Sequence, residues 1–183
     1  RVERRVDVYC LALLLGYGFF RVLLNATYSS AMSTVRDMTS VNAVNFEFSF
    51  ASSFSILLTS AALVVWSCMK PNSRLHVAGV ISAAALLVMN VLSGIGVFDG
   101  LLNEAGMIAL ASVWGLTSIA TNAAWLVPFV GMGPRRCLTT LIASMLVSAL
   151  ISLGLSTLPE VAQDVLLTGV GLASIVLFCF MCR

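Results

Sequence analysis

Six apolar stretches, each long enough to cross a lipid bilayer, dominate this sequence. A membrane-spanning helix needs about 20 mostly apolar residues. Of the 183 residues, 60% are hydrophobic and only 10% are charged, whereas a soluble domain carries about 25% charged residues. A water-soluble fold of this size could not bury so many apolar side chains, and a bilayer can. We therefore predict an all-α polytopic membrane protein with spans at Val8–Ala31, Phe46–Met69, Val77–Phe98, Ala105–Met132, Cys137–Thr157 and Val165–Cys182.

The segments between these spans carry turn signals. Most of them are short and contain proline or glycine, which stop helices: Lys70–His76, Asp99–Glu104, Gly133–Arg136 and Leu158–Asp164. The segment Met32–Asn45 is polar and is predicted to be the longest loop. Within the fourth span, Pro128 is predicted to bend the helix.

The charges orient the predicted spans. If the chain alternates across the membrane, one side receives most of the basic residues: Arg1, Arg4, Arg5, Lys70, Arg74, Arg135, Arg136 and Arg183. The other side receives Arg36 and the acidic residues Asp37, Glu47, Asp99, Glu104, Glu160 and Asp164. Because basic loops stay in the cytoplasm, both termini are predicted to be cytoplasmic, in a cell (inner or plasma) membrane. An odd number of spans would destroy this asymmetry.

All five cysteines map to the cytoplasmic ends of predicted spans. That compartment is reducing, so we predict no disulfides. Cys179 and Cys182 form a C-x-x-C pair, for which metal binding, redox chemistry and lipidation compete with simple packing of small apolar residues. The sequence contains no catalytic dyad, metal-ligand cluster, phosphate loop or nucleotide motif. We therefore predict a non-enzymatic protein without catalytic residues, metal or cofactor.

The spans differ in character, and the differences recur after three spans. The first and fourth carry polar and aromatic residues at helical spacing: Tyr17, Arg21, Asn25 and Tyr28, then Trp114, Thr117, Ser118, Thr121, Asn122 and Trp125. The second and fifth are rich in serine, and the third and sixth are the most lipid-like, apart from Asn90. This recurrence predicts a single domain, 1–183, built from two inverted three-helix repeats, 8–98 and 105–182.

This arrangement resembles one six-helix half of a major facilitator superfamily bundle. The resemblance implies that the first and fourth spans line a ligand cavity, through Tyr17, Arg21, Asn25, Trp114, Thr117, Ser118, Thr121 and Asn122. It also implies that serines of the second and fifth spans face a second six-helix half, from the same chain or a second copy: Ser49, Ser53, Ser144, Ser148 and Ser152. The family's loop motif, G-x-x-x-D-R-x-G-R-R, is replaced here by K-P-N-S-R-L-H at Lys70–His76.

Arg21 lies at membrane depth in the first span. A charge there is costly unless it faces water, the bundle interior or a partner. The functional interpretation is an anion-binding or gating residue. The alternatives are a side chain that reaches the outer surface or an ion pair with Glu47 or Asp37. No Asp, Glu or His lies mid-membrane, which argues against proton coupling.

Tyr17 and Trp114 are open to two interpretations. They could form an aromatic wall for an organic ligand, or they could simply pack together. For Tyr28 and Trp125 the sequence favours packing or interfacial anchoring.

A second resemblance concerns the membrane regions of actinobacterial, especially coriobacterial, LuxR-type regulators. The features that carry it are richness in Cys and Met, scarcity of Lys, L-L-L-G-Y-G-F-F-R at Leu13–Arg21 and G-P-R-R at Gly133–Arg136. It implies a ligand-sensing domain whose helix-turn-helix lies beyond Arg183, so that nucleic acid is contacted only outside these residues. The chain starts at Arg1 rather than Met, which favours a fragment.

Three functions are left open by the sequence. The preferred hypothesis is a membrane-embedded sensor of a small molecule. The alternative is half of a secondary transporter for a small organic molecule, and the third is a scaffold without a ligand. The expected partners are the lipid bilayer, a second six-helix half and a small-molecule ligand.

Overall fold

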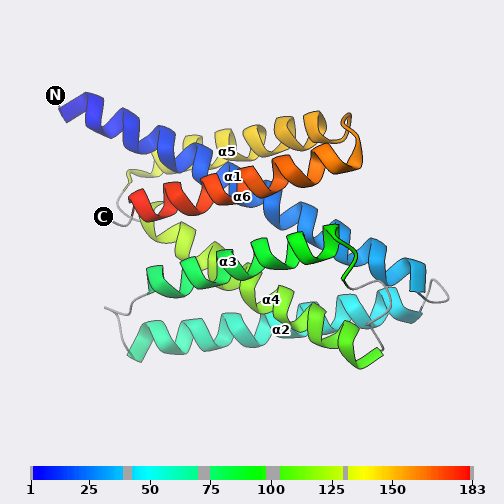
Figure 1. Cartoon of the computed structure of the whole chain (residues 1–183). Coiled ribbons are helices and arrows are strands. Elements are labelled where there is room, and N and C mark those ends of the chain that lie inside the picture. Colours follow the sequence, from blue (N-terminus) through cyan, green and yellow to red (C-terminus); the bar gives the residue numbers. More distant parts are fainter. Residues whose placement is uncertain (1, 39–42, 70–74, 98–103, 130–131, 182–183) are drawn as a thin grey trace. The chain divides into compact units, whose positions relative to one another are not determined.

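The structure, a computed structural model, is built from helices. It describes residues 2–38, 43–69, 75–97, 104–129 and 132–181. The helices are α1 (Val2–Met38), α2 (Ala43–Met69), α3 (Leu75–Gly94), α4 (Glu104–Leu126), the short 3-10 helix η1 (Val127–Phe129), α5 (Pro134–Leu155) and α6 (Glu160–Met181) (Figure 1). No strand occurs within these ranges. The prediction of an all-α chain is therefore confirmed.

Six of these helices are long and apolar enough to cross a membrane. Their apolar spans are Val8–Ser29, Phe48–Trp66, Leu75–Gly94, Ile108–Phe129, Pro134–Leu155 and Val161–Met181. Each overlaps one predicted span over most of its length, although the ends differ. The lengths of 19 to 22 residues match the thickness of a bilayer core at about 1.5 Å per residue.

The predicted long loop Met32–Asn45 is wrong over most of its length. Helix α1 continues to Met38 and α2 begins at Ala43, so only residues 39–42 lie between the two helices. The segment is polar, which suggested a loop, but it contains neither glycine nor proline. Without such a residue nothing forces the helix to end where its apolar stretch ends.

Two helices begin earlier than predicted, each beside a proline. Helix α5 starts at Pro134, and the preceding Gly133 has extended backbone angles (φ −60°, ψ 150°). Helix α6 starts at Glu160, directly after Pro159. Proline is tolerated in the first helical turn because the N–H groups there have no partner within the helix. The two prolines were interpreted as loop residues, whereas they mark where helices start.

Proline also changes the end of the fourth span. We predict a bend at Pro128, and in the structure the α-helix stops at Leu126 and continues as one 3-10 turn, Val127–Phe129. Proline has no backbone N–H to donate to the carbonyl four residues earlier. The loss of that bond explains why the helix type changes at this point.

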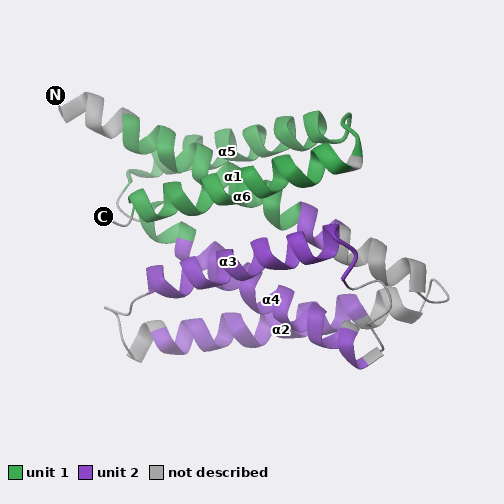
Figure 2. Ribbon diagram, in the orientation of Figure 1, with its two compact units in different colours: residues 1–25, 125–183 green, residues 26–124 purple. Residues whose placement is uncertain are grey.

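The chain divides into two compact units (Figure 2). Unit 1 comprises residues 1–25 and 125–183, and unit 2 comprises residues 26–124. Each unit contains one part of α1 and one part of α4. These units are defined by contacts between residues, whereas the predicted inverted repeats, 8–98 and 105–182, are defined by symmetry. The inverted repeats therefore stay a prediction.

In unit 1, α1 packs closely against α5 and α6. A Cβ atom added at Gly18 would lie 3.0 Å from the carbonyl oxygen of Ser144 on α5. The Ser174 hydroxyl on α6 donates a hydrogen bond of 3.0 Å to the carbonyl oxygen of Gly16. An added Cβ at Gly16 would overlap the ring of Trp125. Glycine therefore allows helix backbones and a large aromatic ring to approach α1 closely.

In unit 2, α2 and α4 pack closely at Gly115. A Cβ added there would lie 2.6 Å from the carbonyl oxygen of Ser52 and 3.0 Å from the Cβ of Ser55. The Ser55 hydroxyl donates a hydrogen bond of 2.7 Å to the carbonyl oxygen of Ser112. A small residue and a hydroxyl thus join the two helices, as is common between helices in membranes.

The outward faces of the helices are apolar. On α5, side chains at three- and four-residue spacing are each about 60% exposed: Leu138, Ile142, Leu146, Leu150 and Leu153. Continuous exposed apolar stripes of this length are rare on monomeric soluble proteins. They are the expected surface of a helix that faces lipid.

Candidate membrane-embedded site

Tyr17 on α1 is enclosed by aromatic rings of unit 1. It is only 5% exposed. Its ring centroid lies 5.7 Å from that of Phe129, 6.0 Å from that of Phe20 and 6.2 Å from that of Trp125. Trp125 is in turn 4.9 Å from Phe178 on α6. Tyr17 therefore forms part of a packed aromatic cluster, and the described rings occupy much of the space around it.

Arg21 lies one helical turn beyond Tyr17 on the same face of α1. Its side chain is half-buried, and it is close enough to the Tyr17 hydroxyl for a hydrogen bond. Arg21 is about 20 Å along the helix from Val8, so it lies well inside the apolar span Val8–Ser29. The alternative ion-pair partners, Asp37 and Glu47, lie outside the described side chains.

Asn25 completes the predicted face of α1. It is exposed, in contrast to the buried Tyr17 and the half-buried Arg21. The face thus changes from closed packing at Tyr17 to an open surface at Asn25. Arg21 lies between these two residues along the face, and its side chain is half-buried.

The predicted polar residues of α4 lie in unit 2, and most are buried. Thr117 donates to the Val113 carbonyl (2.7 Å), Ser118 to that of Gly115 (2.9 Å) and Thr121 to that of Thr117 (2.8 Å). The half-buried Asn122 donates from Nδ2 to the Ser118 carbonyl at 3.0 Å. Each of these groups uses a proton within its own helix. The hydroxyl oxygens of Thr117, Ser118 and Thr121 keep lone pairs that can accept hydrogen bonds.

Trp114 packs against α1 in unit 2. Its ring centroid lies 4.8 Å from that of Tyr28, which lies 6.0 Å from that of Phe48. The Trp114 Nε1–H is buried and has no hydrogen-bond partner in the described part of the chain. An unsatisfied buried donor costs about 1–3 kcal/mol. Among the described rings, Trp114 contacts Tyr28, whereas Tyr17 contacts Phe129, Phe20 and Trp125.

The serines predicted to face a second half differ in exposure. Ser144 and Ser148 on α5 are buried inside unit 1, and Ser144 lies against Gly18 of α1. Ser152 and Ser49 are half-buried, and Ser53 is exposed. The small-residue ridge of α5 is therefore used, at Ser144, for packing within the chain. Contact with a second half stays a prediction.

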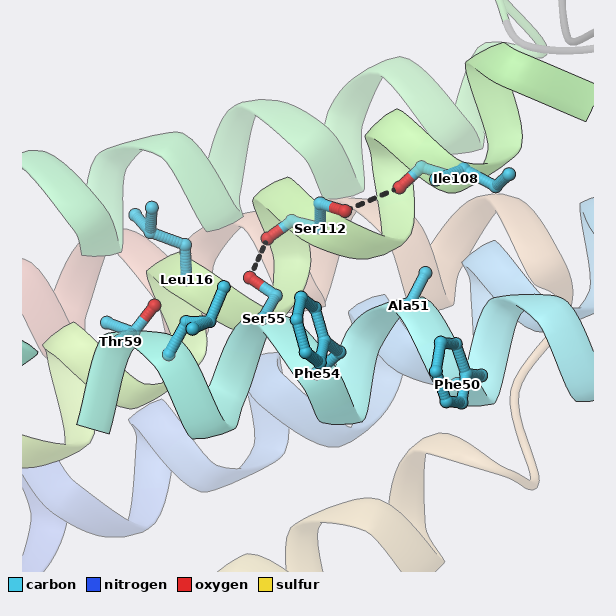
Figure 3. A pocket seen from close by; sticks show the side chains of 9 residues that line it. Phe50, Ala51, Phe54, Ser55, Thr59, Ile108, Ser112 and Leu116 are labelled. Atoms are coloured by element: carbon cyan, nitrogen blue, oxygen red, sulfur yellow. Dashed lines mark hydrogen bonds between the residues drawn. The ribbon is translucent and has the colours of Figure 1, made fainter. Parts of the chain in front are cut away.

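A groove between α2 and α4 was not predicted (Figure 3). It has a volume of about 570 Å³ and is lined by Phe50, Ala51, Phe54, Ser55, Leu58, Thr59, Ile108, Ser112 and Leu116. Six of these nine residues are apolar and three carry hydroxyls. The sequence signal for it is weak, because Ser55 and Thr59, four positions apart, are two of many hydroxyl residues in this serine-rich helix. The sequence could not indicate which helix lies opposite this pair.

The described cysteines show no metal site. Cys10 and Cys137 are half-buried, Cys179 is exposed, and all three are free thiols. Among the described residues, no three His, Cys, Asp or Glu side chains gather as a metal site would require. Cys68 and Cys182 lie outside the described side chains, so the C-x-x-C prediction is left open.

The comparisons with known proteins add no relative. No protein-family model, curated protein or solved structure matches the chain.

Proposed function

We propose that the chain is the membrane-embedded, ligand-sensing part of a LuxR-type transcriptional regulator. In such a protein, a helix-turn-helix outside these 183 residues would bind DNA. The six apolar helices would bind a small molecule and pass the binding signal to that domain. This proposal extends the resemblance described above, and the observation that carries it is the environment of Arg21.

Arg21 supports a ligand-binding role because a charged side chain in an apolar span costs free energy. A guanidinium within the apolar thickness is rarely kept without a function. Its described neighbour is the hydroxyl of Tyr17, which is not a counter-ion. A partly accessible cation beside a packed aromatic cluster suits a small organic molecule that carries a negative or strongly electronegative group.

Sensing is favoured over transport by the absence of proton-coupling groups. In the central parts of the six described spans, tyrosines and cysteines aside, Arg21 is the one residue with an ionisable side chain. A proton-coupled carrier usually uses an Asp, Glu or His within the membrane. Half of a secondary transporter for a small organic molecule is the second candidate, since a partner half could supply such a group.

The deciding experiment is chromatin immunoprecipitation of the tagged, full-length gene product from cross-linked cells. A membrane-bound regulator should enrich specific promoter fragments. Arg21→Ala should change the set or extent of enriched fragments, and Arg21→Lys should retain them in part. Equal amounts of wild-type and variant protein in the membrane fraction are the control. A lack of enriched DNA, together with solute uptake that Arg21→Ala abolishes, would establish the transporter instead.

A further inference from the structure

We propose that the groove between α2 and α4 is a binding site for a lipophilic molecule that carries a hydrogen-bond donor, such as a long-chain alcohol. The groove is separate from the residues discussed under the proposed function, because none of the predicted cavity residues lines it. The inference therefore stands independently of sensing or transport. It rests on three features of the groove: its place on the outward surface, its shape and its hydroxyl groups.

The groove opens on an exposed, apolar surface of α2 and α4. Its rim residues Phe50, Phe54 and Leu58 on α2 are 52–62% exposed, and Ile108 and Leu116 on α4 are 43–50% exposed. All five lie within apolar spans. With these helices in a bilayer, a molecule would enter the groove from the lipid phase, which selects for lipophilic compounds.

The shape of the groove suits an elongated chain. The lining residues of α2 extend from Phe50 to Thr59, which corresponds to about 14 Å along the helix. The rings of Phe50 and Phe54 are stacked, with centroids 6.1 Å apart and planes only 7° apart, so two parallel rings line this part of the groove. Gly115 lets α4 approach α2 closely at Ser52 and Ser55. A volume of about 570 Å³ is within the range of small-molecule sites.

The hydroxyl groups give the groove its chemical preference. The Ser55 hydroxyl donates its proton to the Ser112 carbonyl at 2.7 Å, and the Ser112 hydroxyl donates its own to the Ile108 carbonyl at 2.8 Å (Figure 3). Their protons are used, but each oxygen keeps lone pairs that can accept. Thr59 adds a third hydroxyl to the lining. Lipid acyl chains have no donors, so a ligand with a hydroxyl or amide N–H would gain bonds that bulk lipid cannot form.

The test uses the full chain in phospholipid vesicles and a long-chain primary alcohol with a diazirine in its alkyl chain. After photolysis, mass spectrometry should locate the label on peptides that contain residues 50–59 and 108–116. The methyl ether of the same alcohol lacks the donor and should label these peptides about fivefold less. The double variant Ser112→Ala with Thr59→Val should lower labelling by the alcohol and leave labelling by the ether unchanged. Thr168→Val, which removes a part-buried hydroxyl from α6, is the matched control.

A second variant separates loss of the site from loss of folding. Ala51→Phe should fill the groove and abolish labelling by both probes, whereas Ala84→Phe on the exposed surface of α3 should leave it unchanged. Unaltered melting temperatures show that the variants fold. Labels spread evenly over the outward faces of all helices would show that the groove is not a binding site. Equal labelling of the groove by alcohol and ether would overturn its preference for a donor.

Discussion

Ser174 and Gly16 are separated by 158 positions in the chain and are joined by one hydrogen bond. The hydroxyl of Ser174 on α6 donates to the carbonyl oxygen of Gly16 on α1 at 3.0 Å, and the bond is buried. The carbonyl can be reached from outside its own helix because Gly16 has no side chain to cover it. The pair therefore holds α6 against α1 at a position where both helices are surrounded by apolar groups.

Replacing Ser174 by alanine should weaken this contact measurably. Hydrogen bonds between membrane helices contribute about 0.6 kcal/mol on average, so we expect Ser174→Ala to lower the free energy of unfolding by about that amount. Unfolding of the purified protein in mixed micelles by increasing SDS measures it. Ser156→Ala is the control, because the Ser156 hydroxyl is exposed and bonds only within its own helix. Equal effects of the two substitutions would show that the bond to Gly16 contributes nothing.

Gly115 should tolerate no side chain. Gly115→Ala would place a Cβ atom 2.6 Å from the Ser52 carbonyl oxygen, so α2 and α4 must move apart. We expect a loss of stability of about 1–3 kcal/mol, seen as a lower melting temperature in detergent. A Cβ at Gly169 on α6 meets nothing within 4 Å. Gly169→Ala should therefore leave the melting temperature unchanged or raise it, since alanine favours helix. A melting temperature for Gly115→Ala equal to that of the wild type would refute this close packing.

Trp125 should be the most sensitive tryptophan in the chain. It is 1% exposed and contacts Phe178, Tyr17 and Gly16. Trp125→Ala should cost about 3–5 kcal/mol through the cavity that it leaves. Trp66 on α2 is 54% exposed, so Trp66→Ala should cost much less. Thermal unfolding followed by circular dichroism compares the two variants, and a similar cost for both would contradict the aromatic cluster of unit 1.

The sequence predicted the helices well because hydropathy alone identifies apolar spans. It predicted their ends poorly. Polarity after Ala31 suggested a loop, but no residue there stops a helix, and α1 continues to Met38. Pro134 suggested a turn, although a proline in that position begins a helix equally well. Helix ends depend on single residues, whereas helix existence depends on the whole span.

The candidate sites were less accessible to sequence analysis. The spacing of Thr117 and Thr121 correctly placed both on one face of α4, and both are buried. Spacing could not indicate that their protons are used within the helix, because that depends on the rotamer of each side chain. The α2–α4 groove depends on which residues of another helix lie opposite Ser55. This pairing depends on packing between segments that are 57 positions apart in the chain. The periodicity of residues along one helix cannot predict it.

The orientation predicted from the charges can be tested at the two ends of α5. Gly133 and Ser156 flank this helix, and both are exposed. The 22 residues of α5 extend about 33 Å, enough to put its ends on opposite sides of a bilayer core. In a background without native cysteines, Ser156→Cys should react with a membrane-impermeant maleimide in right-side-out vesicles. Gly133→Cys should react only after the vesicles are opened, because Arg135 and Arg136 are predicted to place that end in the cytoplasm. The reverse pattern would invert the orientation, and reaction at both positions in sealed vesicles would show that α5 does not cross the membrane.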